Sequence, residues 1–156
     1  MTSTITAGTL KVTIRESIIL KGKDQGSTTE LSISDINEVA SRIVTATTTE
    51  AVIIAMGTVI AAGQFLESKV RYIRITNLDD TNHVSLTFRN EDSDEFGVKL
   101  DKGQSFIYNG DLSGGVVDTM EAAATAITPG TFADLVDITA LADTASCDLE
   151  IFVASE

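Results

Sequence analysis

Large apolar and polar residues alternate along much of the chain, in short runs separated by polar turns. Leu10, Val12 and Ile14 alternate with basic and polar residues, and Ile73 and Ile75 repeat the pattern later in the chain. A period of two places one set of side chains on one face of an extended strand. The pattern therefore predicts β-strands, each with one face toward a core.

The first two alternating runs predict a β-hairpin. The first run continues to Leu20, residues 22–27 are typical of a turn, and Leu31 and Ile33 begin the return strand. Residues 34–39 also resemble the start of a capped helix. The threonine-rich sequence that follows is a poor helix former, so a strand preceded by at most one helical turn is expected.

The middle of the chain predicts further strands. The continuous apolar run at 51–56 is too short for a typical globular helix and indicates a buried strand. Residues 70–90 predict two strands joined by an exposed turn at 78–82. The core positions of the second of these strands are Val84, Leu86 and Phe88.

The remaining strands are predicted at 96–100, 105–108, 135–140 and 147–154. Residues 109–130 form an irregular excursion, with room for one short helix near 119–127. Segments of this length between strands are more often functional or variable than simple connectors.

About nine short strands, spaced by polar turns, are typical of a sandwich or barrel. We therefore expect an all-β fold, a single-domain antiparallel β-sandwich of jelly-roll-like type. Residues 1–9 are expected to form an N-terminal arm, and residues 10–156 the sandwich domain.

Composition supports an all-β fold and argues against a nucleic-acid partner. Aromatics are 5% of residues and Trp is absent, so the core depends on Ile, Val, Leu and Ala. The formal net charge is -12, whereas phosphate binding needs a basic patch. Four basic residues near the start of the chain come closest to such a patch, but they alternate with apolar residues and are expected on the outer face of a strand. They are Lys11, Arg15, Lys21 and Lys23.

The sequence predicts no enzyme and no cofactor. Cys147 is the single cysteine, which excludes an internal disulfide, and it alternates with apolar residues as a small buried side chain does. His83 is the only histidine and is predicted to lie in a turn, so a catalytic triad has no clear general base. One Cys and one His cannot supply the usual ligands of zinc.

Calcium is the metal that the sequence allows. Two polar turns carry clustered carboxylates, the ligand type that calcium prefers, although their spacing does not match an EF-hand loop. Acidic turns in an acidic protein are usually solvated, so no metal is predicted and these carboxylates remain weak candidates. They are Asp79, Asp80, Asp92 and Asp94.

Targeting signals are also absent from the pattern. The first residues have no basic and long apolar segments of the secretory type. No apolar run approaches the 18 or more residues of a membrane span. We therefore expect synthesis in the cytoplasm and no membrane partner.

Three segments in the second half of the chain carry a resemblance. They are YIRITNLD at 72–79, FGVKLDKGQSF at 96–106 and ALADTASCDLE at 140–150. Their arrangement resembles small virion structural proteins of tailed bacteriophages, especially those of marine and cyanobacterial hosts. The shared motifs are structural rather than catalytic.

This resemblance implies a β-sandwich that binds other virion proteins. The leading expectation is a non-enzymatic capsid decoration or cement protein on the virion surface. It would be a homo-oligomer, with a trimer favoured, that stabilises the phage head by binding the major capsid protein. The alternatives are a tail or neck component and, from another class, a monomeric calcium- or carbohydrate-binding module.

Ten residues are the predicted partner contacts. Apolar residues on the second face of a sandwich sheet suggest subunit contacts, while the alternative is that both faces are covered within one domain. The predicted contacts lie in the arm, on that face and in the irregular excursion: Thr2, Ser3, Ile5, Tyr72, Phe106, Tyr108, Phe152, Val116, Val117 and Met120.

Overall fold

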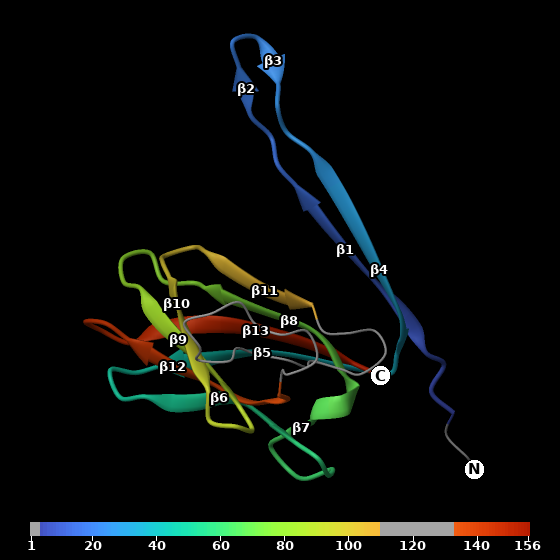
Figure 1. Cartoon of the computed structure of the whole chain (residues 1–156). Coiled ribbons are helices and arrows are strands. Elements are labelled where there is room, and N and C mark those ends of the chain that lie inside the picture. The colour runs from blue at the N-terminus through green and yellow to red at the C-terminus, as the bar shows by residue number, and fades with distance from the viewer. Residues whose placement is uncertain (1–3, 110–132) are drawn as a thin grey trace.

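Two largely antiparallel sheets and a projecting hairpin make up the computed structural model, which describes residues 4–109 and 133–156 (Figure 1). The helix predicted near 119–127 lies outside the described residues. Within the described ranges, no helix is long and apolar enough to cross a membrane.

The first sheet has five strands. In spatial order they are β10 (Glu95–Leu100), β9 (Val84–Asn90), β12 (Leu135–Ala142), β6 (Ala51–Gly57) and β7 (Phe65–Leu66). All neighbouring strands in this sheet are antiparallel except the short β6–β7 pair, which is parallel.

The second sheet has four strands, all antiparallel. In spatial order they are β11 (Ser105–Asn109), β8 (Val70–Asn77), β13 (Cys147–Ser155) and β5 (Glu38–Ala46). A single 3-10 turn, η1 (Glu67–Lys69), leads into β8. The two sheets together confirm the predicted all-β sandwich, and within residues 4–109 and 133–156 they contain nine strands.

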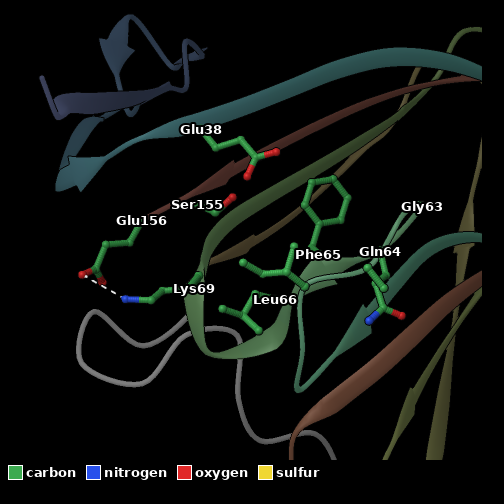
Figure 2. Close-up of a pocket in the computed structure, with 10 residues that line it drawn as sticks. Glu38, Gly63, Gln64, Phe65, Leu66, Lys69, Ser155 and Glu156 are labelled. Carbon is green, nitrogen blue, oxygen red and sulfur yellow. Dashed lines mark hydrogen bonds and ion pairs between the residues drawn. The ribbon is translucent and has the colours of Figure 1, made fainter. Parts of the chain in front are cut away.

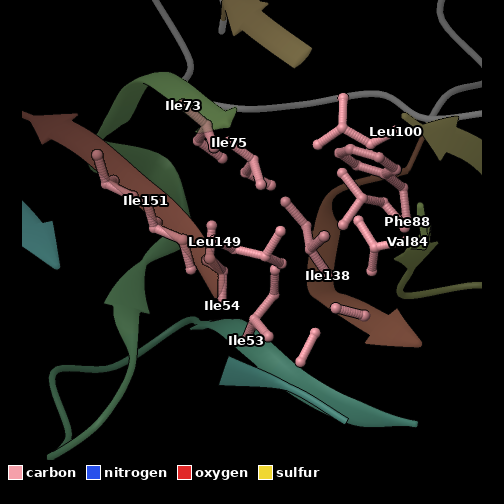
Figure 3. Close-up of a cluster of buried hydrophobic side chains, with 14 of the residues drawn as sticks. Ile53, Ile54, Ile73, Ile75, Val84, Phe88, Leu100, Ile138, Leu149 and Ile151 are labelled. Carbon is pink, nitrogen blue, oxygen red and sulfur yellow. The ribbon is translucent and has the colours of Figure 1, made fainter. Parts of the chain in front are cut away.

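The core lies between the two sheets, where the predicted alternation places apolar side chains (Figure 3). Ile73 and Ile75 of β8 are fully buried, as are Val84, Leu86 and Phe88 of β9. Burial of this kind contributes about 1.5–3 kcal/mol per large apolar side chain. The predicted core positions of residues 70–90 are therefore confirmed.

A long β-hairpin projects from one end of the sandwich (Figure 1). It is built from β1 (Gly8–Arg15) and β4 (Thr28–Ile36) and continues into a short pair, β2 (Ile19–Leu20) and β3 (Lys23–Asp24). The predicted hairpin is thus confirmed, with its reversal at residues 21–22. The β1–β4 and β2–β3 pairs form separate two-stranded sheets and join neither sheet of the sandwich.

The reversal uses two residues with positive φ, Lys21 at 51° and Gly22 at 75°. Two-residue hairpin loops of type I′ need positive φ at both positions, and glycine adopts it without steric cost. A third positive φ, 62° at Asp35, lies where the β1–β4 register shifts. The helical turn considered for residues 34–39 is replaced by this irregularity and the start of β5.

The base of the hairpin covers part of the outer face of the four-stranded sheet. Ile33 and Ile36 of the hairpin form a buried cluster with Tyr72 and Ala154 of the sheet. The half-buried residues packed against this cluster are Leu10, Val12, Leu31, Ile107 and Phe152. Both faces of the sheet are therefore covered here within one chain.

The assignment of two aromatics to the outer face was wrong. Phe106 and Tyr108 pack against the core between the sheets, whereas their neighbour Ile107 packs toward the hairpin. Strand β11 has apolar side chains on both of its faces because both faces of this sheet are covered. Alternation alone therefore does not identify the inner face.

Candidate interaction surfaces

The structure does not pair the single cysteine with the single histidine as a nucleophile and its base. Cys147 is fully buried, and burial raises the pKa of its thiol. The Sγ atom lies 3.5 Å from the carbonyl oxygen of Ala145 and 3.8 Å from that of His83. Carbonyl oxygens accept hydrogen bonds but do not serve as general bases, so this geometry favours the predicted structural role.

The four carboxylates considered for calcium lie in two separate turns. Asp79 and Asp80 follow β8, while Asp92 and Asp94 lie in the turn between β9 and β10. Among the described residues, no group of three or more His, Cys, Asp or Glu side chains is arranged to hold a metal ion.

The predicted contact residues lie in different environments. Tyr72 is buried beneath the hairpin and Phe152 is half-buried beside it, at a ring-centroid distance of 6.0 Å. Phe106 and Tyr108 pack against the main core. Ile5 is 70% exposed and remains open to a partner. The other five lie outside the described residues: Thr2, Ser3, Val116, Val117 and Met120.

The hairpin tip, residues 16–27, exposes a cluster of large apolar side chains. Ile18, Ile19 and Leu20 are 49%, 73% and 56% exposed. The tip is held by its own hydrogen bonds, including Glu16 N to the carbonyl oxygen of Ser27 at 2.8 Å. Exposed apolar residues that are grouped on a projecting element are typical of interaction sites.

The tip carries two charges of each sign, and the two positive charges lie at its distal end, while Glu16 and Asp24 accept hydrogen bonds from Ser27 and Gly26. Lys21 and Lys23 are both exposed, directly after the apolar cluster. Residues 8–36 contain four Lys or Arg and four Asp or Glu, whereas the rest of the chain contains seven and nineteen. The hairpin is therefore neutral overall, and the formal charge of -12 resides in the rest of the chain.

A second surface feature is a depression of about 490 Å³ at the opposite end of the four-stranded sheet, which we call the Ile43 hollow. Its lining includes Ile43, Thr45, Leu78, Asp79, Asp80 and Asp148. Ile43 and Leu78 are 63% and 46% exposed, so the hollow combines apolar surface with carboxylates.

The carboxylates of the Ile43 hollow are held in place by local hydrogen bonds. The Asp79 carboxylate accepts the backbone N–H groups of Asn82 and Thr81, at 2.5 and 2.8 Å, which lowers its pKa. The hydroxyl of Thr45 donates to Asp148 at 2.7 Å. Among the described residues, no Lys or Arg lines this hollow, whose charged side chains are all carboxylates.

A second depression, of about 390 Å³, lies beside the base of the hairpin (Figure 2). Its lining includes Ser155, whose buried Oγ makes no hydrogen bond within the described part of the chain. Lys69 pairs with Glu156 at 3.4 Å, and Arg71 pairs with the same carboxylate. Hydrogen bonding from Arg71 is the largest cause of the lowered pKa of Glu156. Lys69 and Arg71 are thus both paired with Glu156.

Sequence reasoning missed the hairpin tip as a site. The available signal was the run of Ile18, Ile19 and Leu20, because three consecutive apolar residues cannot all face one side of a strand. The Ile43 hollow had a weaker signal, since Ile43 and Asp148 become neighbours only when β5 pairs with β13.

Comparison with known proteins adds little to this description. No protein-family model matches the chain, and no curated protein matches it. Among solved structures, the chain is similar to one from Bacillus endospore appendages, described as a novel family of disulfide-linked pili. The TM-score is 0.44 at 11% identity, covering 76% of this chain and 84% of that one. A likeness of this degree carries no conclusion about function.

Proposed function

We propose that this protein is a non-enzymatic structural subunit that attaches to other proteins through its hairpin tip. The observation that supports this proposal is the exposure of Ile18, Ile19 and Leu20 at the end of the hairpin. Burying such side chains contributes about 1.5–3 kcal/mol each, so a partner that covers them gains affinity.

The setting that we propose is the virion of a tailed bacteriophage, with the protein as a capsid decoration or cement protein. This part of the proposal rests on the resemblance of the segments at 72–79, 96–106 and 140–150 to small phage virion proteins. The partner would be the major capsid protein, and a homo-oligomer, with a trimer favoured, would bind at the capsid surface. A tail or neck position is the second candidate within the same class.

The test is co-sedimentation with phage capsids that lack the protein. A tip variant carries Ile18→Ser, Ile19→Ser and Leu20→Ser. The control variant carries Val59→Ser and Ile60→Ser, which remove comparably exposed apolar side chains, 64% and 90%, from a loop of the sandwich.

We expect wild type and control to sediment with capsids and the tip variant to bind at least about a hundredfold more weakly. Circular dichroism should show all three to be folded. Equal binding by the tip variant would contradict the role of the tip, and failure of all three to bind would contradict the capsid setting. Copy number separates the two virion positions, because hundreds per particle favour the capsid and six or twelve favour the tail axis.

A further inference from the structure

The hairpin tip and the Ile43 hollow are complementary in chemistry. The tip presents Ile18, Ile19 and Leu20 beside Lys21 and Lys23. The hollow presents apolar surface beside carboxylates, and no basic residue of the described ranges lines it. Contact between the two would cover exposed apolar side chains on both and bring opposite charges together.

The hairpin base and the Ile43 hollow lie at opposite ends of the four-stranded sheet. Strand β13 runs from Asp148, in the hollow, to Ser155, whose carbonyl oxygen accepts the backbone N–H of Asn37 next to the hairpin base. The hairpin then extends away from the sheet, so that its tip stands clear of the sandwich (Figure 1). In this arrangement the tip does not contact the hollow of its own chain.

We propose that the hairpin tip of one copy docks into the Ile43 hollow of a second copy. This inference rests on the proposed function and identifies a second partner for the tip, a copy of the same chain. A contact between two different surfaces of identical subunits is head-to-tail, and it forms a ring when the rotation closes or a filament when it does not. A closed ring is compatible with a trimer of free subunits. Because every tip in such a ring is occupied, one tip binds either a neighbouring copy or the capsid protein and not both at once.

Lysines and aspartates at the edge of such a contact determine which surfaces meet. Opposite charges speed encounter and set the register, while like charges in the same place oppose docking. Reversing the charge on one side should therefore prevent association, and reversing both sides should restore it.

The experiment is a charge-reversal swap measured by sedimentation velocity at low ionic strength. The tip-reversed variant carries Lys21→Glu and Lys23→Glu, and the hollow-reversed variant carries Asp80→Lys and Asp148→Lys. A fourfold variant carries all the changes. All of these side chains are exposed, so the sandwich should fold in each variant, which circular dichroism checks.

We expect wild type to associate as its concentration rises, and each twofold variant to associate at least about tenfold more weakly. An equimolar mixture of the two variants should recover association into alternating open chains or even-membered rings, because a tip then meets a hollow of opposite charge on the other variant; a closed ring of three cannot alternate. The fourfold variant should recover it alone.

Three results would overturn this inference. A wild type that remains monomeric at all concentrations excludes self-docking, yet capsid binding by the same protein would leave the proposed function intact. Loss of association on tip reversal without loss on hollow reversal would mean that the tip docks elsewhere. Failure of the mixture and of the fourfold variant to recover would show that the two sets do not meet.

Discussion

Phe88 is the centre of an aromatic cluster in a chain with few aromatic residues. It is fully buried, and its ring stacks on that of Phe96 with centroids 4.6 Å apart and an interplanar angle of 6°. The ring of Phe106 lies 4.8 Å away in a tilted arrangement. Because these rings come from β9, β10 and β11, the cluster joins the two sheets.

Replacing Phe88 by alanine should remove the centre of this cluster. We expect Phe88→Ala to lower the free energy of unfolding by about 3–5 kcal/mol, because both the apolar contact and the filled volume are lost. Phe152→Ala is the control, since Phe152 is half-buried at the hairpin base and should cost less. Urea denaturation measures both, and equal losses would contradict the central position of Phe88.

The protonation of Asp79 is expected to affect the stability of the protein at acid pH. Its carboxylate accepts two backbone N–H groups, which lowers its pKa from the ordinary value near 3.8. The stabilisation from a lowered pKa is present above the ordinary pKa and is lost as pH falls through the folded-state pKa. Asp79 therefore contributes to stability at neutral pH and not in strong acid.

The Asp79→Asn variant tests this linkage, because asparagine keeps a side-chain acceptor for the turn but does not titrate in this range. We expect the melting temperature of the variant to fall less than that of wild type between pH 7 and pH 3. Asp92→Asn, in the other acidic turn, is the matched control. An identical pH dependence in wild type and Asp79→Asn would show that the hydrogen bonds do not stabilise the turn.

At the residue scale, alternation in the sequence identified the buried positions of β8 and β9. It failed at Phe106 and Tyr108 for a physical reason: strand parity separates two sets of side chains but does not say which set faces the larger core. Tyr72 was placed correctly on the outer face, but its burial depends on the hairpin base, which is distant in sequence.

The hairpin is the element on which both proposals depend. Its strands and turn were predictable, because β-branched alternation and turn residues are local signals. The point at which the hairpin leaves the sandwich was not predictable. Leu10, Val12 and Ile14 lie on the same face of their strand, but only Leu10 and Val12 pack at the hairpin base. Alternation shows that residues share a face and not how far along the strand that face stays covered.

Gly22 should be important for the hairpin tip and not for the sandwich. A β-branched side chain is strained at the positive φ of this position, so Gly22→Val should loosen the tip. We expect faster hydrogen exchange at the amides of 18–25 and unchanged exchange in β8. Lys21→Asn is the matched comparison and should slow exchange at the tip, since Asn-Gly suits this turn. Faster exchange throughout the protein would mean that the tip and sandwich unfold together.

For the whole molecule, the fold class followed from local patterns and the candidate surfaces did not. The two packed sheets of the described residues confirm the predicted all-β sandwich, because strands with one apolar face require a covering layer. The hairpin strands, predicted as part of the sandwich, form separate two-stranded sheets. The Ile43 hollow depends on strand order, which brings β5 beside β13 across about a hundred residues of chain. Long-range pairing of this kind is not visible in a local pattern.

Head-to-tail docking makes a prediction about mixed assemblies. A shortened chain, in which Asn-Gly replaces residues 16–27, keeps the β1–β4 pair closed at Arg15 and Thr28. The shortened chain keeps the Ile43 hollow but lacks the tip. Its hollow can bind the tip of one neighbour, but it has no tip to bind the hollow of another. Alone, it should be folded and monomeric.

Small amounts of the shortened chain should therefore terminate wild-type assemblies. We expect one shortened chain for every ten wild-type chains to reduce the mean size of open assemblies, or to open closed rings. Mass photometry measures both effects. An equal amount of the hollow-reversed Asp80→Lys, Asp148→Lys variant should also terminate assemblies, because its tip docks but its hollow receives nothing. If neither variant changes the size of wild-type assemblies, the subunits do not associate through tip and hollow.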